Sequence, residues 1–92
     1  MERILLSDTP NLGALSEFIT LLDKLQNDFE LQTVSINFTD TENRNMFAEL
    51  RGDIGTIKLD FNYYDSKFYI ISYNKPTEKL EKIKSVIKDF IK

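Results

Sequence analysis

The sequence predicts one α+β domain over residues 1–92, with the element order α-β-β-β-β-α. Apolar residues recur at helical spacing near both ends of the chain, and they alternate with polar residues in between. Short polar links separate the alternating segments, which predicts a four-stranded antiparallel meander. Because two amphipathic helices must bury their apolar stripes, both are expected to pack on one face of the sheet and to leave the other face open.

The first helix is predicted over residues 10–29. Thr9 can cap its first turn, and Pro10 suits the first helical position, where the missing N–H costs nothing. The apolar stripe of this helix comprises Leu12, Leu15, Phe18, Ile19, Leu22, Leu25 and Phe29. Before the helix, Ile4–Leu6 fits either an extra edge strand or an extended lead-in.

Four segments in which polar and apolar residues alternate predict the strands, and they cover residues 33–39, 46–51, 57–63 and 67–73. One turn is expected at Gly52-Asp53, with Gly55 as a second break in the pattern. The last two strands are expected to join through a two-residue turn at Asp65-Ser66.

The last helix is predicted to be rich in lysine and to begin after a cap at Asn74 or Thr77. Its apolar stripe comprises Leu80, Ile83, Ile87, Phe90 and Ile91. Residues 75–92 carry six lysines and three acidic residues, a net charge of +3, whereas residues 1–74 carry six basic and twelve acidic residues, a net charge of −6. The acidic body favours a basic partner over nucleic acid.

All four tyrosines lie between residues 62 and 74. A turn at Asp65-Ser66 would pair Phe61 with Ile70, and this register divides the side chains of the last two strands between two faces. The side covered by the helices receives Leu59, Phe61, Tyr63, Phe68, Ile70 and Ser72. The open side receives Tyr64, Tyr69, Ile71 and Tyr73, together with Lys58, Asp60 and Asn62, and Phe47 is expected to point the same way.

Tyrosines flanked by polar groups are the usual composition of a protein interface, although a preference of tyrosine for strands also explains their presence. The sequence therefore gives two candidate surfaces for binding a partner. The first comprises Phe47, Asp60, Tyr64, Tyr69, Ile71 and Tyr73, and the second is a set of acidic loop residues, Asp40, Glu42 and Asp53.

The composition argues against catalysis, because the chain contains neither histidine nor cysteine. Asp53, Asp60 and the segment Asp65-Ser66-Lys67 match the carboxylate and lysine spacing of metal-dependent nucleases only loosely, because the last segment is expected at a turn tip. The acidic loop at Asp40 lacks the glycine and the closing glutamate of a calcium-binding loop. No metal or other cofactor is expected.

The expected function is a non-catalytic protein-binding module, of the inhibitor or immunity type, that blocks a larger partner such as a basic, nucleic-acid-handling protein. Two alternatives are a homodimeric structural or accessory protein that uses the open sheet face, and a divalent-metal nuclease or nucleic-acid binder. The lack of cysteine, of a signal-peptide pattern and of a long apolar segment predicts a cytoplasmic protein that does not enter membranes.

Overall fold

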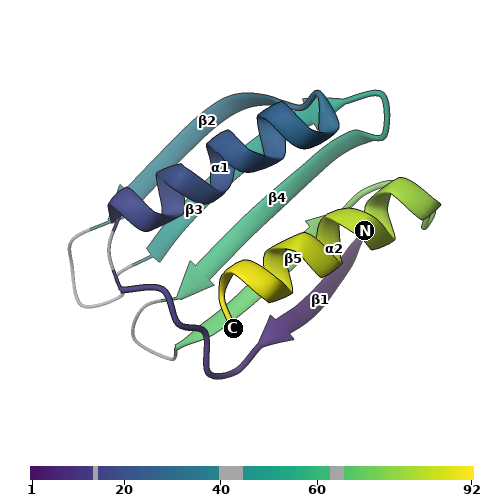
Figure 1. Cartoon of the computed structure of the whole chain (residues 1–92). Helices are drawn as coiled ribbons and strands as arrows, with labels where there is room; N and C mark the ends of the chain where they lie inside the picture. Colours follow the sequence, from purple (N-terminus) through teal and green to yellow (C-terminus); the bar gives the residue numbers. More distant parts are fainter. Residues whose placement is uncertain (14, 40–44, 63–65) are drawn as a thin grey trace.

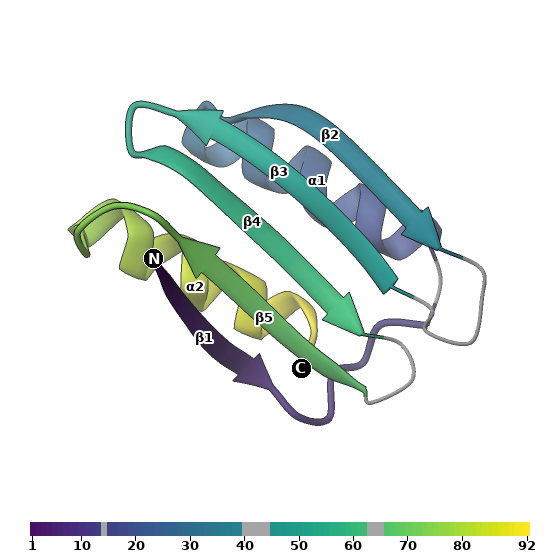
Figure 2. The same ribbon diagram turned by 180° about the vertical axis from the view of Figure 1, so that it is seen from behind.

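A computed structural model describes residues 1–13, 15–39, 45–62 and 66–92. The elements are β1 (Glu2–Ser7), α1 (Leu15–Phe29), β2 (Gln32–Thr39), β3 (Asn45–Gly52), β4 (Gly55–Asn62), β5 (Lys67–Ser72) and α2 (Glu78–Phe90). The five strands form one antiparallel sheet in the order β1-β5-β4-β3-β2. Both helices lie on the same side of this sheet (Figure 1), and the opposite side, called the open face below, is turned to the viewer in Figure 2.

The prediction of an α+β fold is confirmed, but the prediction of four strands is wrong. The fifth strand is β1, which contains Ile4–Leu6 and pairs with β5 at one edge of the sheet. Ile4 lies opposite Ile70, and the Leu6 side chain is buried. This short apolar run therefore extends the core side of the sheet, which an extended lead-in to the helix could not do.

Helix α1 begins at Leu15 and not at Pro10 as predicted. The backbone N–H of Asn11 donates to the carbonyl of Ile91, 2.6 Å away, and Leu12 is buried. This contact holds the described residues before the helix against the end of α2. It competes with the helical conformation that Pro10 would allow for the same residues. At the other end of the chain, Thr77 and not Asn74 caps α2, and its hydroxyl accepts from the N–H of Leu80 at 3.1 Å.

The strands β4 and β5 pair in a register two residues away from the predicted one. Phe61 lies opposite Phe68 and not opposite Ile70, and the ladder ends at the pair Asn62–Lys67. The predicted register is therefore wrong, and Asp65 of the predicted turn lies outside the described residues. A shift of two residues leaves every described side chain of the two strands on its predicted face, because the side-chain period of a strand is two.

The core lies between the two helices and the covered face of the sheet. Phe68 is fully buried and contacts two aromatic neighbours: the centroid of its ring lies 6.4 Å from that of Phe18 on α1 and 5.9 Å from that of Phe61 on β4. The strands contribute a continuous set of buried side chains, namely Met46, Ala48, Leu50, Ile57, Leu59, Phe61, Phe68 and Ile70. Because alternate strand residues fill this core, the residues between them point to the open face.

The turn between β3 and β4 depends on Gly55, whose φ of +90° is favourable only for glycine. A side chain there would also overlap the Asn74 amide, which donates to the carbonyl of Ile54 at 2.7 Å. We expect Gly55→Ala to lower the free energy of unfolding by about 1–3 kcal/mol in urea denaturation. The matched control is Gly13→Ala, because a Cβ at Gly13 would approach nothing closer than Glu17 Oε1 at 3.7 Å. Equal stability of the two variants would contradict the strained turn.

Candidate functional site

The open face carries two parallel rows of side chains that cross all five strands. In the register of the sheet the first row reads Leu5, Tyr69, Asp60, Phe47 and Asn37 from β1 to β2. The second row reads Arg3, Ile71, Lys58, Glu49 and Ser35. Tyrosine, phenylalanine, leucine and isoleucine thus lie among charged groups on the sheet face that neither helix covers (Figure 2).

Arg3 links the tyrosine of the first row to its acidic neighbour. Its guanidinium lies 3.5 Å from the centroid of the Tyr69 ring, and one of its nitrogens lies 3.6 Å from the carboxylate of Asp60. The Asp60 side chain is only 19% exposed. A cation stacked on the ring and paired with the next carboxylate holds Tyr69 in one orientation on the open face.

Lys58 occupies the centre of the second row, between two aromatic rings. Its ammonium lies 5.1 Å from the centroid of the Tyr73 ring and 5.8 Å from that of Phe47. The hydrogen bond with the Tyr73 hydroxyl, and more weakly the charge of Glu49 at 3.9 Å, raises the pKa of Lys58 above its ordinary value of 10.5. Lys58 therefore remains a cation at neutral pH.

The carboxylates of the open face are matched by cations. Glu49 lies 3.3 Å from Arg51 and 3.9 Å from Lys58, and Asp60 lies 3.6 Å from Arg3. Three basic side chains therefore surround two acidic ones. The net negative charge of the chain is carried elsewhere, and this face is not acidic.

The structure brings most of the predicted residues of the first candidate surface together. Five of the six lie on the open face, namely Phe47, Asp60, Tyr69, Ile71 and Tyr73, whereas Tyr64 lies outside the described residues. Leu5, Arg3, Glu49 and Arg51 also belong to this face and were not among the predicted residues. Alternation along residues 3–6 could have identified Leu5 and Arg3, had that segment been assigned to a strand.

The second candidate surface is not assembled in the described part of the chain. Asp40 and Glu42 lie outside the described residues, and Asp53 lies in the β3–β4 turn. Asp53 is bound by Lys79 of α2, whose ammonium lies 2.6 Å from Asp53 Oδ1.

Asp53 and Asp60 also lie about 20 Å apart along β4, given about 3.3 Å per residue, so they cannot share a metal ion as the loose nuclease match requires. Within residues 1–13, 15–39, 45–62 and 66–92 no three acidic groups converge on a metal site.

The contact between Asp53 and Lys79 gives the structure a testable response to pH. The hydrogen bond from Lys79 holds the pKa of Asp53 below its ordinary value of 3.8. A depressed folded-state pKa contributes stability above the unfolded pKa, and this contribution is lost as the pH falls through the folded value. In an NMR titration we expect Asp53 to titrate below 3.8 in the wild-type protein and close to it in Lys79→Gln. An unchanged titration in Lys79→Gln would show that the contact does not persist in solution.

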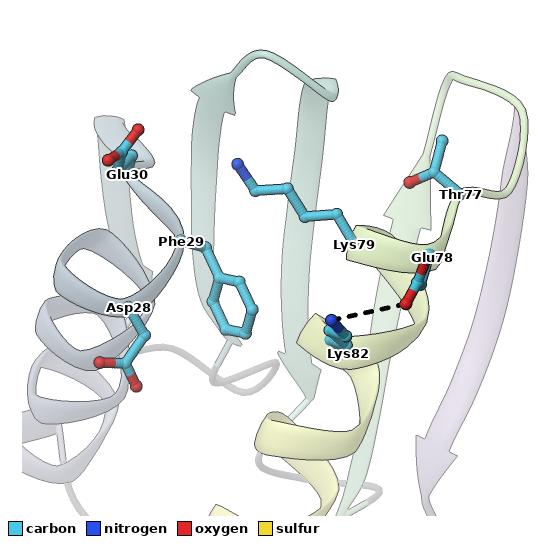
Figure 3. A pocket seen from close by; sticks show the side chains of 7 residues that line it. All are labelled: Asp28, Phe29, Glu30, Thr77, Glu78, Lys79 and Lys82. Atoms are coloured by element: carbon cyan, nitrogen blue, oxygen red, sulfur yellow. Dashed lines mark ion pairs between the residues drawn. The ribbon is translucent and has the colours of Figure 1, made fainter.

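A groove of about 710 Å³ separates the end of α1 from the start of α2. The ring of Phe29 lies between the two helices, and Glu78 pairs with Lys82 at 3.5 Å on one wall (Figure 3). Acidic groups stand on both walls, at Asp28 and Glu78, and the groove is broad and open to solvent. These residues supply no convergent set of donors, so we place the candidate site on the open face.

No protein-family model, curated protein or solved structure matches the chain. None of the helices that the structure describes has the length and apolar content needed to cross a bilayer. The arrangement of residues on the sheet therefore carries the functional argument.

Proposed function

We propose that the protein is a non-catalytic binding module that recognises another protein through the open face, as an inhibitor or immunity-type protein does. The observation that carries this proposal is the group of apolar and aromatic side chains on the sheet face that neither helix covers. Tyr73 is 46% exposed and Leu5 is 45% exposed, Tyr69 and Ile71 on β5 are half-buried, and Phe47 on β3 is half-buried beyond β4. Aromatic side chains that a partner can cover completely supply most of the binding energy of protein interfaces.

The charges around this group indicate what the partner must present. The carboxylates of Glu49 and Asp60 already have cationic neighbours, whereas Arg3, Arg51 and Lys58 have donor groups left for a partner. The matching surface of the partner is apolar at its centre and carries carbonyl or carboxylate acceptors at its rim. A basic partner would instead have to use acidic groups away from the open face.

Single-stranded nucleic acid is the alternative ligand with some support, because its bases stack on aromatic rings that lie between cations. Two observations favour a protein. The guanidinium of Arg3 already covers one face of the Tyr69 ring, and the carboxylates of Glu49 and Asp60 lie among the cations of the open face, where they would repel a phosphate backbone. A base would have to displace the stacked arginine before it could occupy this ring.

The experiment compares proteins captured from cell extract by three forms of the chain. The wild-type chain and a control altered at the far edge of the sheet, Phe38→Ser, should retain the same partner, and Tyr69→Ala with Tyr73→Ala should lose it. Nuclease treatment of the extract separates the two ligand classes. Retention of the partner by the double variant would overturn the proposal, and loss of binding after nuclease treatment would favour nucleic acid.

A further inference from the structure

The strand β2 forms the edge of the sheet opposite β1, and its apolar side chains are unusually exposed. In the part of the chain that the structure describes, β2 pairs with β3 alone. Val34, Ile36 and Phe38 are 45%, 43% and 47% exposed. An eight-residue edge strand with exposed apolar side chains is a ready template for another strand.

Helix α1 adds an exposed side chain beside Ile36 and Phe38. Ile36 and Phe38 lie opposite the buried Ala48 and Met46, so they point to the helix side of the sheet. The backbone N–H of Thr33 donates to Gln26 of α1 at 3.2 Å, which places that side of the helix beside β2 (Figure 1).

Ile19 precedes Gln26 by seven residues, which is two helical turns, so it lies on the same side of α1. Seven helical residues and three strand residues both span about 10 Å, which brings Ile19 level with Ile36. Ile19 is 40% exposed. We call Ile19, Ile36 and Phe38 the edge patch.

The two edges of the sheet differ in charge. Edge strand β1 carries Glu2 and Arg3, whereas Gln32–Thr39 contains no charged residue in a chain that is 29% charged. Charged residues on an edge strand normally prevent strands from pairing between molecules. On α1 the acidic group one turn after Ile19 is Asp23, and it accepts from the Gln26 amide at 3.3 Å. Two copies of the β2 edge can therefore meet without bringing like charges together along the strands.

We propose that two copies of this chain associate through antiparallel pairing of their β2 strands about a two-fold axis at Asn37. The regular part of β2 follows its bulge between Thr33 and Ser35, and Asn37 is the middle residue of that part. Ile36 of one copy then lies opposite Phe38 of the other, twice by symmetry, and the two α1 helices lie side by side with Ile19 near the axis. Such an interface is self-complementary, as a two-fold dimer requires.

This dimer would join the two sheets into one and place both open faces on the same side. It uses none of the residues proposed to bind a partner, so it stands or falls independently of the proposed function.

The first test is the mass of the full chain by light scattering over a range of concentrations. We expect twice the chain mass of 10.8 kDa for the wild-type protein. Ile36→Lys should weaken the dimer by roughly 100-fold or more, because it brings lysines into the apolar contact across the axis. Leu5→Lys, an equivalent change at the other edge, should leave the dimer intact, as should Tyr69→Ala with Tyr73→Ala.

A second test does not require that the Ile36→Lys variant folds. Since the chain has no cysteine, Asn37→Cys introduces a single thiol, and the two thiols would face each other across the axis. Mild oxidation should give a covalent dimer with Asn37→Cys and none with Leu5→Cys. A monomeric wild-type protein at every concentration, a dimer that survives Ile36→Lys, or cross-linking at position 5 in place of 37 would each overturn the proposal.

Discussion

Phe68→Ala is expected to lower the free energy of unfolding by about 3–5 kcal/mol, the usual cost of deleting a fully buried phenylalanine ring. Phe68 joins three elements, because its ring on β5 packs against Phe18 of α1 and Phe61 of β4. Removal of the ring leaves a cavity between the sheet and the helix that no neighbouring side chain can fill without leaving its own contacts. Urea denaturation followed by circular dichroism measures this loss.

The matched control is Phe47→Ala, which removes the same side chain from the opposite face of the same sheet. Phe47 is half-buried among the side chains of the open face, so we expect a loss of about 1 kcal/mol or less. The difference between the two variants tests the assignment of the faces. Similar losses would mean that something covers the open face in solution, which would contradict a free binding surface in the monomer.

The faces of the strands could be predicted from the sequence because they depend only on alternation. The predicted register of β4 and β5 is wrong, yet Tyr69 and Ile71 still lie on the open face and Phe68 and Ile70 in the core. An error of one residue would have exchanged the faces, whereas an error of two does not. The alternation of polar and apolar residues along each strand was therefore enough to predict which side chains share the open face.

Contacts between distant segments could not be predicted in the same way. Strand β1 forms by pairing with β5, more than sixty residues away, and its six residues carry little pattern of their own. The start of α1 depends on a hydrogen bond between Asn11 and Ile91, at opposite ends of the chain. Arg3 reaches Tyr69 and Asp60 only because β1 takes that edge position, so its contribution to the site could be predicted only if this segment was first assigned to a strand.

The distribution of charge is the property for which composition was least informative. The net charge of −3 does not indicate how the charges are distributed on one face. On the open face, Arg3 pairs with Asp60, and Arg51 and Lys58 pair with Glu49. Net charge describes the whole surface, whereas recognition depends on the few groups that lie beside the aromatic rings.

Tyr69→Ala is expected to weaken binding of the captured partner by roughly 30-fold or more, the effect of removing a side chain that contributes at least about 2 kcal/mol. Tyr69 is the second side chain of the first row on the open face, between Leu5 and Asp60. Its ring is already oriented by Arg3, so its immobilisation on binding costs less entropy than that of a free side chain. Calorimetric titration of the partner measures the affinity.

The conservative variant Tyr69→Phe separates the ring from its hydroxyl. It keeps the apolar surface and the stacking surface for Arg3, so we expect it to lose only about 10-fold or less, the value of one hydrogen bond. Phe38→Ser at the edge patch should bind the partner as the wild-type protein does. If Phe38→Ser were impaired while Tyr69→Ala bound normally, the partner would occupy the β2 edge. Because the two variants lie on opposite faces of the sheet, one set of titrations decides between the surfaces.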